Sequence, residues 1–295
     1  MAATAVDRSG SNLGNGKFIP ALYPPILLKK FYAASVCQAI CNTEYQEAVK
    51  QKGNVVHIRK RPDIFVSDSS ENGKVVYQDI NDEEVLLYIN YSKDAAVKIG
   101  NIDLHQMDIN LQEALIDEIA NRLRLSIENT VISSAYASAG TTKTTGAVAA
   151  WNTSGNAVKA MAEIQATLSS GVEPCPTTDR WLLIHPQMRV ALLTDAANYA
   201  MNAGTPQGAL QRGFVAELAG LKIFESPLVP GAGTSGSPFL CMGGHSSAIT
   251  LATQFTSFEA NYLLQDYFGK GIRAQNCFGF KVAKPTSLVS LAVQL

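Results

Sequence analysis

Apolar residues recur every three or four positions across residues 108–136, the longest regular stretch of the chain. They fall at Ile116, Ile119, Leu123, Ile127 and Val131, which places them on one face of a helix. The stretch contains no Gly or Pro that would interrupt it. At about 1.5 Å per residue, the pattern predicts a rod of roughly 43 Å, which is long for a helix of a globular protein.

Residues 54–100 follow a different pattern, in which apolar residues come in short, strand-like runs. The runs are NVVHIRKRPDIFV, a returning KVVYQDI and a long third run, EVLLYINYSKDAAVKI. The turn-rich stretch SDSSENGK separates the first two runs. Together they predict an elongated β-arm of about 45 residues.

Charged residues lie along this arm in blocks of opposite sign. The blocks comprise Arg59, Lys60, Arg61, Asp79, Asp82, Glu83 and Glu84. Two interpretations fit them: two solvated faces, or a projecting arm that docks through these charges on a neighbouring copy of the chain. The second interpretation makes these residues candidates for contacts between subunits.

Polar and helical segments surround the arm and the long helix. Residues 1–25 have the composition of an extended arm without a core, and residues 26–50 predict a helix or two that Gly53 closes. The Ser, Thr and Gly-rich stretch 137–156 is the one plausible internal boundary. After it, NAVKAMAEIQATLSSG predicts an amphipathic helix.

Short apolar runs dominate the C-terminal half. We expect strands in GLKIFES and in PFLCMGGHSSAITLAT, and a terminal strand pair around Pro285 in FGFKVAKPTSLVSLAVQL. The Gly-rich NAGTPQGALQRG predicts a flexible loop.

Composition and charge narrow the classes of function. With 295 residues, 46% of them hydrophobic, the chain can bury a sizeable core in one large domain or two. The net charge of -1 provides no overall field toward nucleic acid or an anionic membrane, so any contact with DNA is expected to be weak. No run approaches the roughly 20 apolar residues of a membrane helix, and the N-terminus lacks the regions of a leader. We therefore expect a protein that is kept in a cytosol.

Candidate catalytic and metal sites are few. The five cysteines lack CxxC spacing and the four histidines lack HExxH, so we expect buried structural cysteines and no metal site. The string GAGTSG at 231–236 has GxGxxG spacing, but no helix is predicted after it to hold a dinucleotide. Asp117 and Glu118 are adjacent on the predicted helix and diverge by about 100°, which favours a solvated face over a catalytic carboxylate pair.

His185 lies in WLLIHPQMRVALLTD, where an apolar strand runs into Pro186 and then into a helix. A helix N-terminus can bind an anion, and a histidine there could act as an acid or base. No Gly-rich phosphate cradle precedes it, and no nucleophile or carboxylate stands at a local spacing. We favour a structural corner and keep the anion site as the alternative.

The order of these segments resembles that of the major capsid protein of tailed bacteriophages with double-stranded DNA. The order is a polar N-arm, a β-arm starting at KGNVVHI, a long uninterrupted helix and a mixed domain. Two places sharpen the resemblance: WLLIHPQMRVALL followed by GFVAELAGLKIFESPLVP, and the closing YFGKGIRAQNCFGFKVAKP. The resemblance covers nearly all of the chain.

The resemblance implies an α+β fold of the tailed-phage capsid type, which is shared with herpesvirus capsid floors. Its segments would be an N-terminal arm, a helical segment and an extended β-loop, followed by a peripheral domain with a spine helix, an axial domain and a C-terminal strand that returns to the peripheral domain. In that order, they would span residues 1–30, 31–53, 54–100, 101–144, 145–275 and 276–295. Some relatives crosslink through a lysine of the extended loop; Lys60 and Lys74 lie in that segment, but no partner motif is found here.

The function implied is self-assembly as pentamers and hexamers into an icosahedral shell around double-stranded DNA, in a virion assembled in the host cytoplasm. The expected partners are other copies of the chain, portal and scaffolding proteins, a decoration protein in some relatives, and DNA through weak contacts. No cofactor and no catalytic residue are implied. Two alternatives stay open: an encapsulin-type shell around an enzyme cargo, and a soluble α/β enzyme with an anion site at the Pro186 helix N-terminus.

Overall fold

The computed structural model describes residues 35–49, 54–62, 64–68, 74, 77–79, 83–106, 111–171, 173–203, 217–218, 220–263 and 268–295. The predicted N-terminal arm, residues 1–30, lies outside the described residues. The predicted loop at 202–213 also lies outside them, apart from its first two residues, which end a helix.

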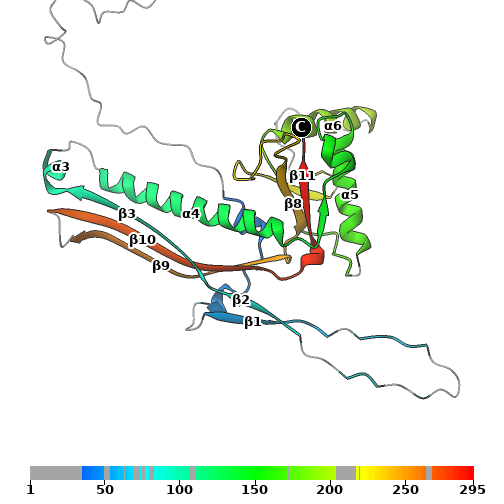
Figure 1. The fold of residues 1–295 in the computed structure, drawn as a ribbon, viewed down its shortest axis with the longest axis horizontal. Coiled ribbons are helices and arrows are strands. Elements are labelled where there is room, and N and C mark those ends of the chain that lie inside the picture. The colour runs from blue at the N-terminus through cyan, green and yellow to red at the C-terminus, as the bar shows by residue number, and fades with distance from the viewer. Residues whose placement is uncertain are drawn as a thin grey trace, which may run out of the picture.

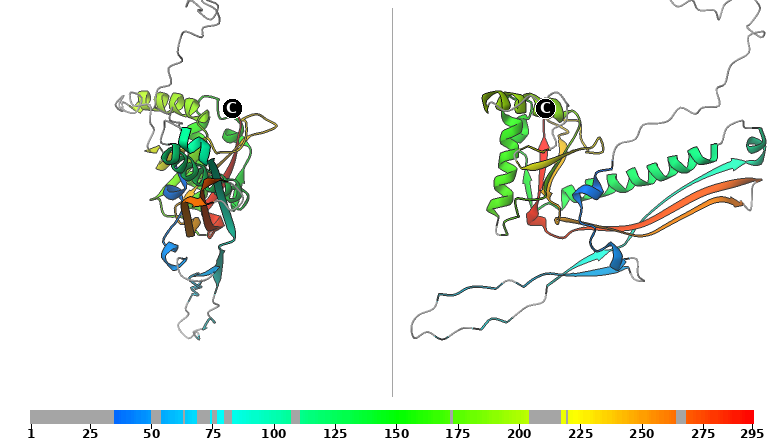
Figure 2. Two further views of the ribbon diagram at one scale, coloured as in Figure 1. Left: turned by 90° about the vertical axis from the view of Figure 1, so that its left-hand side faces the viewer. Right: turned by 180° about the vertical axis from the view of Figure 1, so that it is seen from behind.

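Three parts can be followed in Figure 1, and we call them the finger, the body and the arm. The finger holds the long helix α4 (Leu111–Ala137) over a three-stranded sheet, with the short helix α3 (Asn101–Gln106) at its tip. The body holds a six-stranded sheet with α5 (Asn156–Ser170) and α6 (Met188–Ala203). The arm, residues 54–90, leads away from the finger, as Figure 1 and the right-hand view of Figure 2 show.

The finger sheet consists of β3 (Tyr91–Gly100), β10 (Gly269–Val282) and β9 (Ile249–Leu263), in the order β3-β10-β9 with antiparallel pairing. Helix α4 packs on it: Ile119 and Leu123 are buried against Ile99, Ile272 and Ala274. The first half of the apolar stripe predicted along residues 108–136 therefore faces this sheet. The predicted helix is confirmed over Leu111–Ala137, and residues 108–110 lie outside the described residues.

The last turns of α4 belong to a second core. Val131, Ile132 and Ala135 are almost fully buried and join the large apolar cluster of the body. One continuous helix thus packs on the finger sheet with its first half and in the body with its second half. Because no Gly or Pro interrupts it, the helix can link the two cores without a hinge residue.

The body sheet has the strand order β4-β11-β8-β5-β7-β6. Its strands are β4 (Thr141–Lys143), β5 (Arg180–Ile184), β6 (Glu217–Leu218), β7 (Leu221–Glu225), β8 (Phe239–His245) and β11 (Leu288–Val293). Every residue of β5 and of β11 is buried, as expected for strands covered on both faces. The strands predicted in GLKIFES and PFLCMGGHSSAITLAT are confirmed as β7, β8 and the start of β9.

Short helices complete the described chain. Helices α1 (Cys37–Ile40) and α2 (Gln46–Val49) follow the first described residues, and the 3-10 turns η1 (Gly146–Ala150) and η2 (Pro285–Ser287) precede α5 and β11. Residues 35–49 are the described part of the segment 26–50, for which a helix or two were predicted. They form two single helical turns, and residues 26–34 and 50 lie outside the described residues. No described helix combines the length and hydropathy that a membrane crossing requires.

The arm differs from its prediction in strand pairing. Strand β1 (Val55–Arg59) pairs antiparallel with β2 (Glu84–Tyr88), and the described residues of the predicted returning strand KVVYQDI are not in a strand. The long third run is split at residues 89–90: its first half is β2, and its second half is β3 of the finger sheet. An apolar run cannot show where a strand changes partners, because either sheet buries the same side chains.

Strands are present on both sides of Pro285, as predicted, but they do not pair with each other. Strand β10 pairs with β3 and β9 in the finger, whereas β11 lies between β4 and β8 in the body. Residues 276–295 therefore contribute to both sheets. The turn η2 at Pro285 carries the chain from one sheet to the other, so it does not close a hairpin.

Candidate assembly surfaces

Three of the charges predicted to mark the arm, Lys60, Glu83 and Glu84, form polar pairs across the two strands at its root. Lys60 Nζ lies 3.3 Å from Glu83 Oε2, and the Lys60 amide donates to the Glu83 carbonyl at 2.9 Å. Glu84 Oε2 lies 2.8 Å from His57 Nδ1. These pairs are exposed, so each contributes at most about 1 kcal/mol and serves mainly to align the strands.

Beyond the root, the side chain of Gln78 bridges the two sides of the arm. The amide of Gln78 donates to the Phe65 carbonyl at 2.8 Å and accepts from the Phe65 amide at 3.0 Å. This pair of contacts reproduces what two backbone groups exchange in an antiparallel sheet. The sides of the arm are therefore held together where the described residues form no β-ladder.

Large apolar side chains of the arm are exposed on both of its sides. They are Ile64, Phe65, Val66 and Tyr77, and Val66 is 97% exposed. An exposed apolar cluster of this kind on a projecting segment is typical of a surface that another chain covers. The charge pattern of the sequence predicted contacts at the arm but did not point to this apolar cluster, whose residues lie in NVVHIRKRPDIFV and KVVYQDI.

The seven predicted contact residues divide into three groups. Lys60, Glu83 and Glu84 form the root pairs described above. Arg59, Arg61 and Asp79 are exposed and form no ion pair with any other described residue. Asp82 lies outside the described residues. The structure thus leaves two arginines and one aspartate of the arm available to another molecule.

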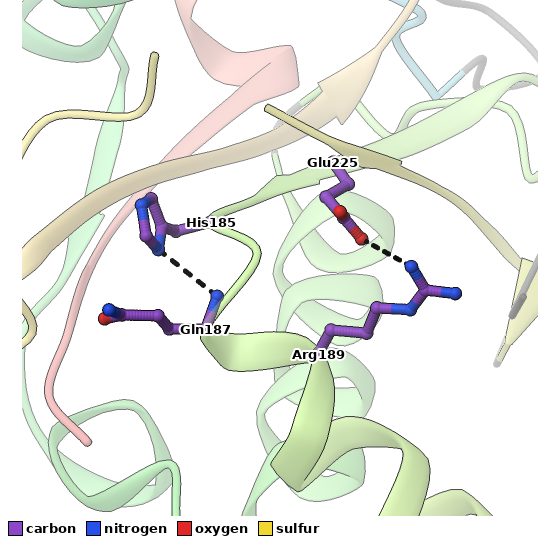
Figure 3. Close-up of polar contacts among 4 residues, drawn as sticks. All are labelled: His185, Gln187, Arg189 and Glu225. Atoms are coloured by element: carbon purple, nitrogen blue, oxygen red, sulfur yellow. Dashed lines mark hydrogen bonds and ion pairs between the residues drawn. The ribbon is translucent and has the colours of Figure 1, made fainter. Parts of the chain in front are cut away.

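The His185 corner is built from the chain itself (Figure 3). The Gln187 amide donates to His185 Nδ1 at 3.3 Å, and the Met188 amide donates to the His185 carbonyl at 3.0 Å. The imidazole stacks on Phe239 with ring centroids 4.2 Å apart. Because Nδ1 accepts a hydrogen bond, the neutral ring carries its proton on Nε2.

Burial lowers the pKa of His185, although the nearby Glu225 carboxylate opposes this shift. Glu225 is itself paired with Arg189 at 3.1 Å. The first amides of the turn into α6 are thus already used by His185, which removes the donors that an anion would need. This geometry fits the structural corner better than the anion site.

The remaining candidates from the sequence are the cysteines, a metal site and the GxGxxG string. Four of the five cysteines are buried and Cys277 is partly exposed, and burial raises the pKa of the Cys241 thiol to about 12. Within the described part of the chain, no group of three or more His, Cys, Asp or Glu side chains gathers as in a metal site. The GxGxxG string at 231–236 is followed by strand β8, as expected from its sequence context.

Three buried charged residues, Asp195, Arg180 and Glu128, bind distant parts of the fold to each other. None of them was predicted from the sequence. Asp195 of α6 accepts from the amides of Gly155 and Ala157 at 2.8 and 3.0 Å, and so caps α5. Arg180 is 1% exposed and donates to three backbone carbonyls and two side chains of α5 and of the loop before β5. Glu128 of α4 accepts from the Ser35 hydroxyl and the Val36 amide.

The sequence does hint that Asp195 is unusual. Aspartate is a poor residue for the interior of a helix, and no neighbour in the sequence explains its presence there. Its partners are 38 to 40 positions away, so only the folded chain can identify them.

Residues 97–288 match the model of a family described as phage capsid protein. The match begins within β3 and ends at the first residue of β11, so it covers most of the finger and most of the body. A comparison with curated proteins returned no match.

Solved structures resemble the chain over almost its whole length. A chain from Mycobacterium phage Che8 is 26% identical with a TM-score of 0.79, over 92% of this chain and 96% of that one. The capsid of Cyanophage P-SCSP1u has 16% identity and a TM-score of 0.75 over 100% of both chains, and the mature capsid of bacteriophage PhiM1 has 11% and 0.72 over 99% and 97%. These likenesses confirm the predicted tailed-phage capsid fold, with its α+β mixture. The chain therefore belongs to the phage capsid protein family, and it is a structural major capsid protein of the virion.

Proposed function

We propose that copies of this chain assemble as pentamers and hexamers into an icosahedral shell that encloses double-stranded DNA, with no enzymatic activity of the chain itself. The observation that carries the proposal is the arm, which leads away from the finger and exposes apolar side chains that a monomer would normally cover. A neighbouring copy in the shell would bury them. The near-zero net charge supports weak contact with the enclosed DNA, because tight binding requires many released counterions.

We assign separate roles to the charges of the arm. The pairs of Lys60, Glu83 and Glu84 hold the root, while Arg59, Arg61 and Asp79 are the proposed contacts to the neighbouring copy. Asp82 remains a candidate of the same kind. Complementary charges on the arm and on the neighbouring copy would fix where the arm docks. They would contribute less to how tightly it binds.

The parts of the chain are proposed to take the roles expected from the family. The finger would be the peripheral domain and the body the axial domain, with 1–30 as the N-terminal arm. The extended loop, expected at 54–100, would end at residue 90, because β3 lies in the finger sheet. Strand β9, within the axial domain expected at 145–275, would for the same reason belong to the peripheral domain. Because β11 lies in the body sheet, we propose that the C-terminal contribution to the peripheral domain ends at Val282. Portal and scaffolding proteins, with a decoration protein in some shells, are the further partners proposed, with assembly in the host cytoplasm.

The first test is expression of the chain alone, followed by light scattering and negative-stain microscopy. Particles of tens of nanometres, or rings of five and six copies, would support the proposal. A compact species of one to four copies at all concentrations would contradict it and would favour the enzyme alternative. Particles that contain a protein cargo in place of DNA would favour the encapsulin alternative.

A charge-reversal pair tests the arm within the same assay. The double variant Arg59→Glu, Arg61→Glu is expected to stay as small oligomers, because it reverses the charge of both proposed arginine contacts at the root of the arm. The matched variant Arg59→Lys, Arg61→Lys keeps the charge and should still form particles. Near-ultraviolet circular dichroism from the buried Trp151 and Trp181 would show that both variants are folded. Normal particles from the Glu variant would refute the proposed contacts.

A further inference from the structure

Helix α4 covers two of the three strands of the finger sheet. Its buried contacts are with Ile99 of β3 and with Ile272 and Ala274 of β10, and no described side chain of β9 belongs to that apolar cluster. A helix is about 10–12 Å wide and neighbouring strands lie about 4.8 Å apart, so one helix covers about two strands. Strand β9 therefore lies beyond the helix, at the edge of the sheet.

An apolar cavity lies between α4 and the strands β9 and β10. Its volume is about 460 Å³, and its wall includes Ile116, Leu123 and Ile127 of α4 together with Phe258 of β9. Phe258 is 46% exposed, so the cavity is open to solvent at this residue. It can take apolar side chains of an extended segment that lies along β9.

The edge of β9 already carries an added segment at its start. The Asn42 amide donates to the Ile249 carbonyl at 2.7 Å, and the Leu251 amide donates to the Asn42 carbonyl at 3.0 Å. Along residues 257–263, by contrast, no described backbone group outside the sheet bonds to this edge. An unpaired edge beside an apolar cavity is suited to the addition of a strand from another chain.

The arm carries a segment with matching properties. Residues 64–68 are exposed and lie along one side of the drawn-out arm (Figure 1). The amide and the carbonyl of Phe65 both bond to Gln78 on the other side of the arm. Because backbone groups alternate in direction along an extended chain, those of Ile64 and Val66 point outward, where they bond to no described residue. The segment thus offers a free backbone edge together with exposed apolar side chains.

This segment and β9 cannot meet within one chain, because the arm and the finger lead in opposite directions (Figures 1 and 2). We propose that residues 64–68 of one copy add as a strand to the edge of β9 in a second copy, with apolar side chains in the cavity beside α4. The inference rests on the proposed function and names the surface on which the arm docks. Because the arm and β9 are different surfaces, the contact is head-to-tail, and such contacts close into rings when the rotation between copies permits it.

The first test uses the unassembled full chain and a fluorescent synthetic peptide with the sequence of residues 61–68, RPDIFVSD. The peptide should bind saturably, and the outward-pointing amides among residues 257–263 should exchange hydrogen at least about fivefold more slowly when it is bound. The control is the same peptide with Val66→Pro, because proline keeps an apolar side chain but removes the N–H that strand addition needs. It should bind at least about tenfold more weakly.

Two variants of the full chain locate the bound peptide. Phe258→Ala should weaken peptide binding by about tenfold, because it removes a large apolar side chain from the wall of the cavity. Val190→Ala is the matched control: Val190 is 70% exposed but lies on α6 of the body, so binding should not change. The Val66→Pro comparison needs no variant of the chain, so it holds even where a substitution disturbs folding.

Disulfide crosslinking tests the same contact in assembled particles. Val66→Cys is combined in turn with Thr253→Cys, Ser257→Cys and Ala260→Cys, which covers three registers of the added strand. On mild oxidation, at least one pair should give a ladder of linked copies that stops at five or six. Val66→Cys alone and Val66→Cys with Val190→Cys should give no such ladder.

Several results would overturn the inference. These are no saturable peptide binding, unchanged hydrogen exchange in β9, or equal binding of the Val66→Pro peptide. A link formed by Val66→Cys alone would show that arms pair with each other and would overturn it as well. Particles without any link to β9 would overturn the inference and leave the proposed shell intact. Peptide binding to β9 in a chain that never forms particles would support the strand addition and contradict the shell, so the two proposals fail separately.

Discussion

The cap that Asp195 provides for α5 offers the sharpest test of the folded body. Helix α5 starts after Gly155, whose φ of 84° and lack of a side chain leave the helix without a local cap. Asp195, 3% exposed on α6, replaces that cap with two charge-assisted hydrogen bonds, at 2.8 and 3.0 Å, to the amides of Gly155 and Ala157. The negative charge also lies at the positive end of the helix dipole.

The magnitude follows from these contacts. Asp195→Asn keeps one acceptor, removes the charge and turns an NH₂ group toward a backbone N–H, so we expect a loss of about 2 kcal/mol in the free energy of unfolding. Asp195→Ala removes both acceptors and leaves two buried amides unpaired, for a loss of about 4 kcal/mol. The adjacent Thr194→Ala is the control, because its exposed hydroxyl bonds only the Val190 carbonyl, and it should change stability by less than about 0.5 kcal/mol.

The assay is urea unfolding of the unassembled chain, followed by tryptophan fluorescence. Both tryptophans report on the same core, since Trp151 and Trp181 are buried in the body and Trp151 donates to the Met188 carbonyl of α6 at 3.2 Å. Hydrogen exchange adds a local readout: the amides of Gly155 and Ala157 should exchange faster in both Asp195 variants. If the free energy of unfolding of Asp195→Ala lies within about 0.5 kcal/mol of the wild-type value, the claim that α6 caps α5 is refuted.

Three further predictions concern other buried contacts. Arg180→Lys should lower the free energy of unfolding by about 3 kcal/mol in the same assay, because an ammonium cannot satisfy the acceptors that surround the guanidinium; a loss below 1 kcal/mol would contradict this. Gly279→Ala should cost about 2 kcal/mol, since its Cβ would lie 2.3 Å from the Tyr88 carbonyl where β10 passes the end of β2, whereas Gly236→Ala has open space and should be neutral. The lowered pKa of His185 means that the unfolded chain binds its proton more readily, so this group's contribution to stability is present above pH 6.5 and is lost as pH falls through the folded pKa. His185→Asn keeps an acceptor and does not titrate, so it should flatten the fall in stability below pH 6.5, as measured by thermal unfolding across pH; an unchanged slope would argue against the shift.

Much of the secondary structure could be predicted from local sequence patterns. The apolar stripe of α4 is a property of spacing alone, and a helix of 27 residues without Gly or Pro can be identified without knowing what covers it. The same holds for β5 and its passage through Pro186 into α6, where the missing amide of proline and the end of an apolar run mark the corner. The order of such segments was enough for the family resemblance, which the comparisons confirmed.

Those patterns could not show which strands pair or which charged side chains meet in the folded chain. The run at 84–100 contributes to two sheets, and the strands on either side of Pro285 lie in different ones, because a strand's alternation shows which side is buried and not which strand lies beside it. The charged blocks of the arm were visible, but only the fold shows that Lys60 and Glu84 are used within it while Arg61 stays free.

The sequence by itself determined the elements and their order, since helix period, strand alternation and turn residues act over a few neighbours. The tertiary structure alone decided which distant groups meet: Asp195 with the start of α5, and Glu128 with Ser35 at the edge of a cavity. Those pairs are separated by 40 and 93 positions, and they form because burial leaves each polar group only the partners that the fold brings to it.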